Sequence, residues 1–150
     1  MPKSDLKARI SEATTAAMRA RERERLAVLR LINSDLKRVE VDERRELSDK
    51  DVVTILTRMV KQRQDSLSQF EAAGRDDLAE QERFELGIIR EFLPEPLAED
   101  ALDGLVEAAI KDTGAQSMSD MGKVMGVLKP QVEGRADMGA VSAKVKARLG

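Results

Sequence analysis

The last 30 residues of the sequence, 121–150, concentrate side chains that could bind an anion. They hold six basic residues against two acidic ones, whereas the whole chain has 26 basic and 28 acidic residues. Lysine and arginine bind the phosphates of nucleic acids through charge and hydrogen bonds. A solvated helix face is the other explanation for such a charge run. The residues that we predict as RNA phosphate contacts are Lys123, Lys129, Arg135, Lys144 and Lys146.

Arg135 lies just before Asp137, the expected N-cap of the last helix. A helix N-terminus beside an arginine can bind a phosphate, because its backbone N–H groups and its dipole favour negative charge. Asp137 as the N-cap would fill that position and repel an anion. Between these interpretations we favour an Arg135–Asp137 pair. Gly134, in the preceding loop, is expected to adopt a left-handed conformation.

Two glycines, Gly122 and Gly126, are four residues apart and share one face of a predicted helix. Glycine inside a helix costs roughly 1 kcal/mol relative to alanine, so a compensating contact is expected. One interpretation is close helix–helix packing within a small bundle. The other is a smooth surface that a protein or nucleic-acid backbone can approach, and for this we predict an interface of Met121, Gly122, Met125 and Gly126.

The sequence contains no histidine and no cysteine. Their absence excludes Ser-His-Asp and Cys-His catalytic arrangements, disulfides, and ordinary histidine or cysteine metal sites. Catalysis would have to use Asp, Glu, Lys, Arg or Ser. We therefore predict no catalytic residue, no metal and no cofactor.

Arg63 interrupts the apolar face of a long predicted helix, so we expect its side chain to be partly buried. A buried arginine needs a carboxylate partner, and Glu82 and Glu85 on the following helix are the candidates. These polar residues could form a pocket. We favour the alternative, in which they are interhelical salt bridges that fix how the two helices pack.

The elements that carry these residues are predicted to be helices throughout, because apolar residues recur at helical spacing and no segment alternates like a strand. In the N-terminal part, Ser48 and Asp51 have the spacing of a capping box that opens the second of two long helices. Gly74 is placed to end that helix, and a further helix is expected over residues 76–91.

The segment Pro94-Glu95-Pro96 breaks the helical pattern and is the best domain boundary. We expect an all-α protein, with an N-terminal bundle of long helices over residues 1–93 and a C-terminal three-helix domain over residues 97–150. The first of the three helices is expected to end at Thr113–Gly114. The second is opened by the capping-box pair Ser117 and Asp120 and closed by Pro130.

No apolar stretch approaches the roughly 20 residues that a membrane-spanning helix needs. The N-terminus also lacks an apolar run of signal-peptide length. We therefore expect a cytoplasmic protein with no membrane partner.

Four segments of the sequence resemble the GatB/YqeY family. MGKVMGVLKPQVEGRADMGAVSAKVKARL is similar to the C-terminal tail domain of GatB, the B subunit of the bacterial tRNA-dependent amidotransferase. The segments TAAMRARERERLAVLRLINSDLK, MVKQRQDSLSQFEAAGRDDLAEQE and IIREFLPEPL resemble YqeY-type stand-alone proteins. One departure is Ala140, where such tails often carry a basic residue.

The resemblance implies a two-part helical fold and a tail domain that helps to hold tRNA. The kinase-like and glutaminase centres of the amidotransferase lie in other parts of that complex. A family label of carbon–nitrogen ligase with glutamine as amido-N-donor would thus describe the complex. Our first functional hypothesis is a module that contacts tRNA or a tRNA-charging complex. The second is a protein–protein adaptor, and the last is an enzyme of amide chemistry.

Overall fold

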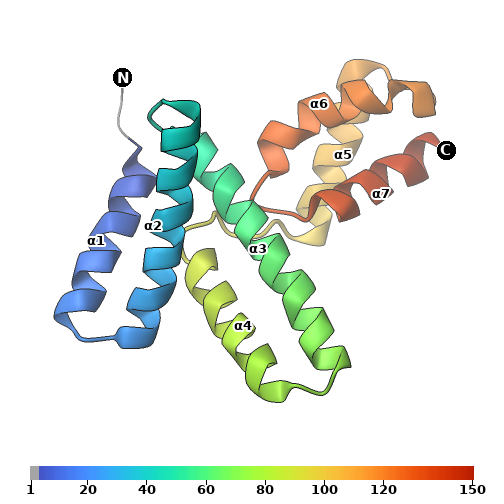
Figure 1. Cartoon of the computed structure of the whole chain (residues 1–150). Helices are drawn as coiled ribbons and strands as arrows, with labels where there is room; N and C mark the ends of the chain where they lie inside the picture. The colour runs from blue at the N-terminus through green and yellow to red at the C-terminus, as the bar shows by residue number, and fades with distance from the viewer. Residues whose placement is uncertain (1–3) are drawn as a thin grey trace. The chain divides into compact units, whose positions relative to one another are not determined.

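Helices supply all the regular structure in the computed structural model of the chain, which describes residues 4–150 (Figure 1). Over these residues there are seven α-helices, one short 3₁₀ turn and no strand. The all-α prediction is confirmed. The helices fall into two compact units, residues 1–93 and Pro94–Gly150, and each unit has its own hydrophobic core.

The first unit consists of two helical hairpins whose apolar faces meet. Its helices are α1 (Asp5–Arg19), α2 (Arg23–Glu43), α3 (Asp49–Ala72) and α4 (Asp76–Arg90). Helix α1 packs against α2, and α3 packs against α4 (Figure 1). The hairpins join through contacts of α2 with α4 and of α1 with α3. The largest fully buried side chains at this junction are Ile10, Leu29, Ile32, Leu36, Leu56, Met59 and Ile89.

The start of α1 is tied to the start of α3 by one carboxylate. Ser4 Oγ caps α1 by accepting the Lys7 N–H at 3.0 Å, and it donates its own proton to Asp49 Oδ1. The same Asp49 oxygen accepts the Leu6 N–H at 3.1 Å. These hydrogen bonds hold the pKa of Asp49 below its usual range, the Ser4 bond being the largest cause. One side chain at the start of α3 therefore satisfies two donors at the start of α1, which helps to fix how the hairpins meet.

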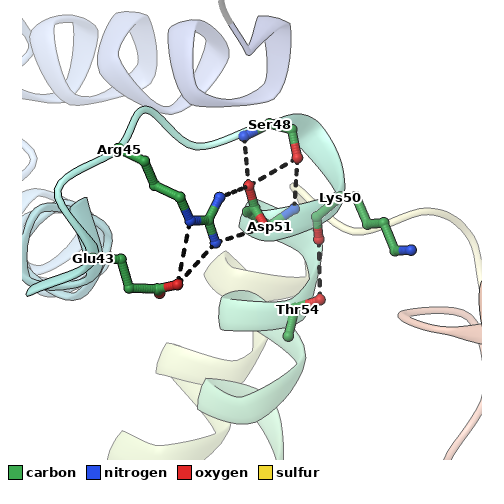
Figure 2. A network of polar contacts seen from close by, with 6 residues as sticks. All are labelled: Glu43, Arg45, Ser48, Lys50, Asp51 and Thr54. Carbon is green, nitrogen blue, oxygen red and sulfur yellow. Dashed lines mark hydrogen bonds and ion pairs between the residues drawn. The ribbon is translucent and has the colours of Figure 1, made fainter.

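Helix α3 opens with the capping box expected from the sequence (Figure 2). The Ser48 hydroxyl accepts the Asp51 N–H at 3.2 Å, and Asp51 Oδ2 accepts the Ser48 N–H at 2.8 Å. Arg45 adds a bidentate contact to the Asp51 carboxylate at 2.6 and 3.2 Å and also binds Glu43. The pKa of Asp51 is held far below its usual range, chiefly by Arg45, so this cap stays ionised.

Three connections in the first unit pass through left-handed backbone. Gly74 follows α3 with φ of 70°, as expected for a helix-ending glycine. Arg21 and Arg44 follow α1 and α2 with φ of 58° and 51°. A residue with a β-carbon pays roughly 1–2 kcal/mol in this region, so both arginines are held there by the turns around them.

The second unit is a three-helix bundle made of α5 (Glu99–Thr113), α6 (Met121–Val132) and α7 (Met138–Leu149). Gly114 ends α5 in the left-handed region with φ of 66°, as predicted. The Ser117–Asp120 box is present, but it opens the 3₁₀ turn Met118–Asp120 that leads into α6. The core is aliphatic, and its fully buried members are Val106, Val124, Leu128, Val132, Val141 and Val145.

The prediction that Pro130 closes α6 is wrong, because the helix continues through it to Val132. Proline inside a helix costs about 3 kcal/mol, since it removes one backbone hydrogen bond and crowds the preceding turn. Here Val132 is fully buried in the core. Burying such a side chain is worth about 1.5–3 kcal/mol, which offsets much of that cost.

Candidate nucleic-acid interface

One face of α6 carries no packing contact within its unit. A β-carbon added at Gly122 or Gly126 would meet no other helix within 4 Å, in the part of the chain that the structure describes. The interpretation that these glycines serve close packing inside the bundle is therefore wrong. Lys129 lies on the same stripe by helical spacing, and Lys123 lies beside it. All four residues are exposed, and we call them the α6 face.

The two methionines predicted for an interface lie deeper than the glycines. Met121 and Met125 are half-buried and pack against the core of the second unit. Among the methionines of the second unit, the exposed one is Met118, in the preceding 3₁₀ turn, with 43% of its surface accessible. Met118 was not predicted, because a three-residue turn has no apolar periodicity in the sequence.

Two cations of α7 are paired within the bundle. Lys144 Nζ lies 2.8 Å from both Asp103 Oδ1 and Glu99 Oε2 of α5. These hydrogen bonds, the Asp103 bond first, raise the pKa of Lys144. Arg148 lies 2.6 Å from Glu107 one turn further along. Residues 94–120 hold seven acidic residues and one basic residue, so the basic end partly complements this acidic segment.

Arg135 serves the loop structure of the second unit. Its Nε donates to the main-chain oxygen of Glu95 at 3.1 Å, and its own main-chain oxygen accepts the Leu97 N–H at 2.8 Å. The expected Arg135–Asp137 pair is wrong, because the Asp137 carboxylate caps α7 by accepting the Ala140 N–H at 3.0 Å. Gly134 has φ of 79°, as predicted for this loop.

Of the five cations predicted as RNA contacts, fewer are free of contacts within the second unit than the sequence suggests. Lys123 and Lys129 on α6 and Lys146 on α7 are exposed. Lys144 and Arg135 make the contacts described above. RNA binding by all five cations stays a prediction. At Lys144 and Arg135, RNA would have to compete with the contacts that these side chains make within the unit.

In the first unit, Arg63 of α3 faces Glu82 and Glu85 of α4. Arg63 Nε lies 3.5 Å from Glu85 Oε2, and about four fifths of both side chains is buried. At this distance the Nε makes no good hydrogen bond. Burial and the neighbouring Glu85 carboxylate raise the pKa of Glu82, while Arg63 partly offsets them. Two carboxylates therefore share one arginine in a mostly buried position.

Within residues 4–150, acidic side chains do not gather into a group of three or more that could hold a metal ion. No helix among these residues is both long and apolar enough to cross a membrane.

Residues 7–149 match the model of the protein family described as Yqey-like protein. The chain belongs to the YqeY-like family. The match includes both units, so the family relationship covers the α6 face as well as the Arg63 cluster.

Two curated relatives of this YqeY-like chain are fungal. An uncharacterized protein of Schizosaccharomyces pombe is 30% identical over 91 residues, covering 61% of this chain and 74% of the relative. The protein of Pyrenophora tritici-repentis named altered inheritance of mitochondria protein 41, mitochondrial, is 26% identical over 137 residues, covering 89% of this chain and 75% of the relative.

The YqeY-like chain also has an open hollow that the sequence analysis did not find. It has a volume of about 560 Å³ and lies between the start of α2 and the second half of α4. Its lining comes from two segments, residues 21–25 and residues 84–91, that are far apart in the sequence, so no local motif marks it. The lining residues are Arg21, Glu22, Arg23, Glu24, Arg25, Phe84, Ile88 and Glu91.

Proposed function

We propose that this chain is a non-catalytic helical module that contacts tRNA, or a complex that charges tRNA, through the α6 face. The observation that carries the proposal is an exposed helix face with two glycines, open space above them, and two lysines alongside. Its similarity to the GatB tail domain, which helps to hold tRNA, supports RNA as the partner.

The α6 face suits a sugar–phosphate backbone better than exposed bases. Without side chains at Gly122 and Gly126, a strand can approach the helix closely while Lys123 and Lys129 reach its phosphates. Lys146 is a further exposed cation. The second unit contains no aromatic side chain on which a base could stack. Binding there should therefore depend on charge and shape, with strong dependence on salt.

Catalysis has no support in the chemistry of the residues present. The chain has no histidine and no cysteine, and the partly buried carboxylates of Glu82 and Glu85 face Arg63 on a neighbouring helix. We propose that the label of carbon–nitrogen ligase with glutamine as amido-N-donor applies to an amidotransferase complex. The pure chain should not hydrolyse glutamine.

A protein–protein adaptor is the second candidate, and the exposed Met118 favours it. Methionine suits adaptable apolar contacts, and the α6 glycines would let a partner helix approach closely. In this case partner capture should survive RNase and high salt. It should fail when Gly122 or Gly126 carries a bulky side chain.

The deciding experiment is binding of labelled total tRNA, unstructured RNA and duplex DNA by fluorescence anisotropy at several salt concentrations. We compare the wild type with Lys123→Glu/Lys129→Glu. The matched control is Lys37→Glu/Lys61→Glu, which makes the same charge change at exposed positions of the first unit. Arg135 and Lys144 are left intact because their contacts support the fold.

Preferential binding of tRNA that the α6 variant loses and the control keeps would support the proposal. Removing two phosphate contacts should also reduce the slope of log K against log salt by about 1.4–1.8. Equal or absent binding to all three nucleic acids would sink the RNA proposal and favour the adaptor.

We also propose a cytoplasmic location, as expected from the sequence. The name of the Pyrenophora relative places that relative in mitochondria. Imaging a tagged chain in its own cell would decide between these compartments.

A further inference from the structure

The hollow between α2 and α4 has one exposed aromatic ring. Phe84 is 38% accessible, whereas Phe92 is 6% accessible and Phe70 is half-buried. Phe84 and the buried Ile88 contribute the apolar side chains of the lining, and charged residues contribute the rest. A volume of about 560 Å³ lies within the roughly 300–1,000 Å³ range of small-ligand pockets.

Within the described part of the chain, one of the three arginines around the hollow is paired with carboxylates and two are not. Arg25 forms a bidentate pair with Glu91 at 2.6 and 3.0 Å and also lies 3.8 Å from Glu22. By contrast, no carboxylate of the described residues forms an ion pair with Arg21 or Arg23. Two exposed guanidinium groups are thus available beside the Phe84 ring.

We propose that this hollow binds an unpaired nucleotide of single-stranded RNA, with its base stacked on Phe84 and its phosphates on Arg21 and Arg23. Stacking of bases on aromatic rings and arginine planes is how proteins hold single-stranded RNA. The site rests on the proposed RNA contact of the chain and deepens it. It assigns base contact to the first unit, whereas the α6 face is assigned backbone contact.

The charge balance predicts how this site differs from the α6 face. Three arginines and three glutamates line the hollow, so its net charge is zero and stacking must contribute most of the affinity. With at most two phosphate contacts, the slope of log K against log salt should be no steeper than about −1.4. Because stacking is not screened by salt, binding here should persist at salt concentrations that release RNA from the lysines of α6.

The test uses the absence of tryptophan from the whole sequence. The Phe84→Trp variant introduces one indole into the hollow and keeps a stacking surface. We titrate it with a mixed-sequence RNA pentanucleotide and with a pentanucleotide of the same length made of abasic residues. Val41→Trp, at a 64% exposed position of α2, is the control for nonspecific quenching.

We expect the base-bearing oligonucleotide to quench the Phe84→Trp variant, and the abasic one to leave it nearly unchanged. Anisotropy with the same oligonucleotides should show Phe84→Ala binding roughly 5- to 150-fold more weakly than wild type, the range for loss of one stacked base. Arg21→Gln/Arg23→Gln should weaken binding and flatten the salt slope, whereas Arg30→Gln, at an exposed position of α2, should not.

Three results would overturn the proposal. These are equal binding of base-bearing and abasic oligonucleotides, equal quenching of the Val41→Trp control, and unchanged affinity in Phe84→Ala. An apolar docking site for a protein would give the last of these. Failure at the hollow is distinguishable from failure at the α6 face, because the latter is judged by tRNA binding of Lys123→Glu/Lys129→Glu.

Discussion

At the scale of single residues, the Asp49 carboxylate joins two helices that are far apart in the sequence. It accepts hydrogen bonds from Ser4 Oγ and from the Leu6 N–H, which belong to a different helix. Ser4 is itself buried, so without this partner its hydroxyl would lose an acceptor away from water.

We predict that Asp49→Ala lowers the free energy of unfolding by about 1–3 kcal/mol at pH 7. Because folding lowers the pKa of Asp49, its contribution is present above the unfolded pKa and is lost as pH falls through the folded pKa. Urea unfolding of wild type and variant at pH 7 and in acid measures the difference. Asp65→Ala, exposed on the same helix, should change little.

The pKa of Glu82 is shifted in the opposite direction from that of Asp49. Folding raises its pKa through burial and the Glu85 carboxylate, so the ionised form destabilises the fold. We predict that Glu82→Gln raises the free energy of unfolding at pH 7 by less than about 1 kcal/mol. The gain should shrink as pH falls through the folded pKa and vanish below the unfolded pKa, as thermal melts across pH would show.

The control for this cluster is Arg63→Ala, which leaves both carboxylates without their cation. It should lower the melting temperature at pH 7. A Glu82→Gln variant with the same gain at every pH would show that the carboxylate charge is not the cause.

At the scale of helices, signals within a few residues could be predicted, whereas most contacts between helices could not; the Arg63–Glu85 pair is an exception, because a polar residue on an apolar face marks it. The Ser48–Asp51 box, the Asp137 cap and the Gly114 stop each involve residues within four positions, so their spacing is visible in the sequence. The Lys144 pairs with α5 span more than 40 positions and depend on how two helices meet. The continuation of α6 past Pro130 likewise depends on tertiary burial of Val132.

The α6 glycines give a prediction in which stability and binding change in opposite directions. Alanine at Gly122 or Gly126 has room and should stabilise the helix by about 0.4–1 kcal/mol. The added methyl groups should nevertheless weaken tRNA binding, because they keep a backbone away from the helix. Denaturation and anisotropy on the same samples measure both effects.

The matched control is Gly104→Ala, an exposed glycine in α5 with equal room. It should raise stability by a similar amount and leave binding unchanged. If all three alanine variants bind tRNA as the wild type does, the α6 face is not a contact surface.

Arg44 at the end of α2 gives a prediction about backbone strain. Its φ of 51° favours glycine, so Arg44→Gly should raise the free energy of unfolding by about 0.5–1 kcal/mol. Arg38→Gly, within the same helix, should lower it by a similar amount. Chemical denaturation of the two variants compares them, and loss of stability in Arg44→Gly would contradict the argument.

At the scale of the whole molecule, the two hydrophobic cores share no residue. The division at Pro94-Glu95-Pro96 therefore predicts two folding units, and the second, with fewer buried side chains, should unfold first. Val106→Ala should lower the midpoint temperature of the first transition only, and Ile32→Ala that of the second only. Calorimetry would follow the two transitions, and nuclear magnetic resonance signals from each unit would assign them. A single transition that both variants shift would contradict the prediction.

The hydrogen bonds of Ser4 and Leu6 to Asp49 provide a way to monitor the protein in solution by hydrogen exchange. Leu6 is the second residue of α1, where a backbone N–H has no acceptor within its own helix and ordinarily exchanges quickly with solvent. Here that N–H is bonded to a residue 43 positions away. Its deuterium exchange rate therefore reports whether α1 is joined to α3, separately from whether α1 is helical.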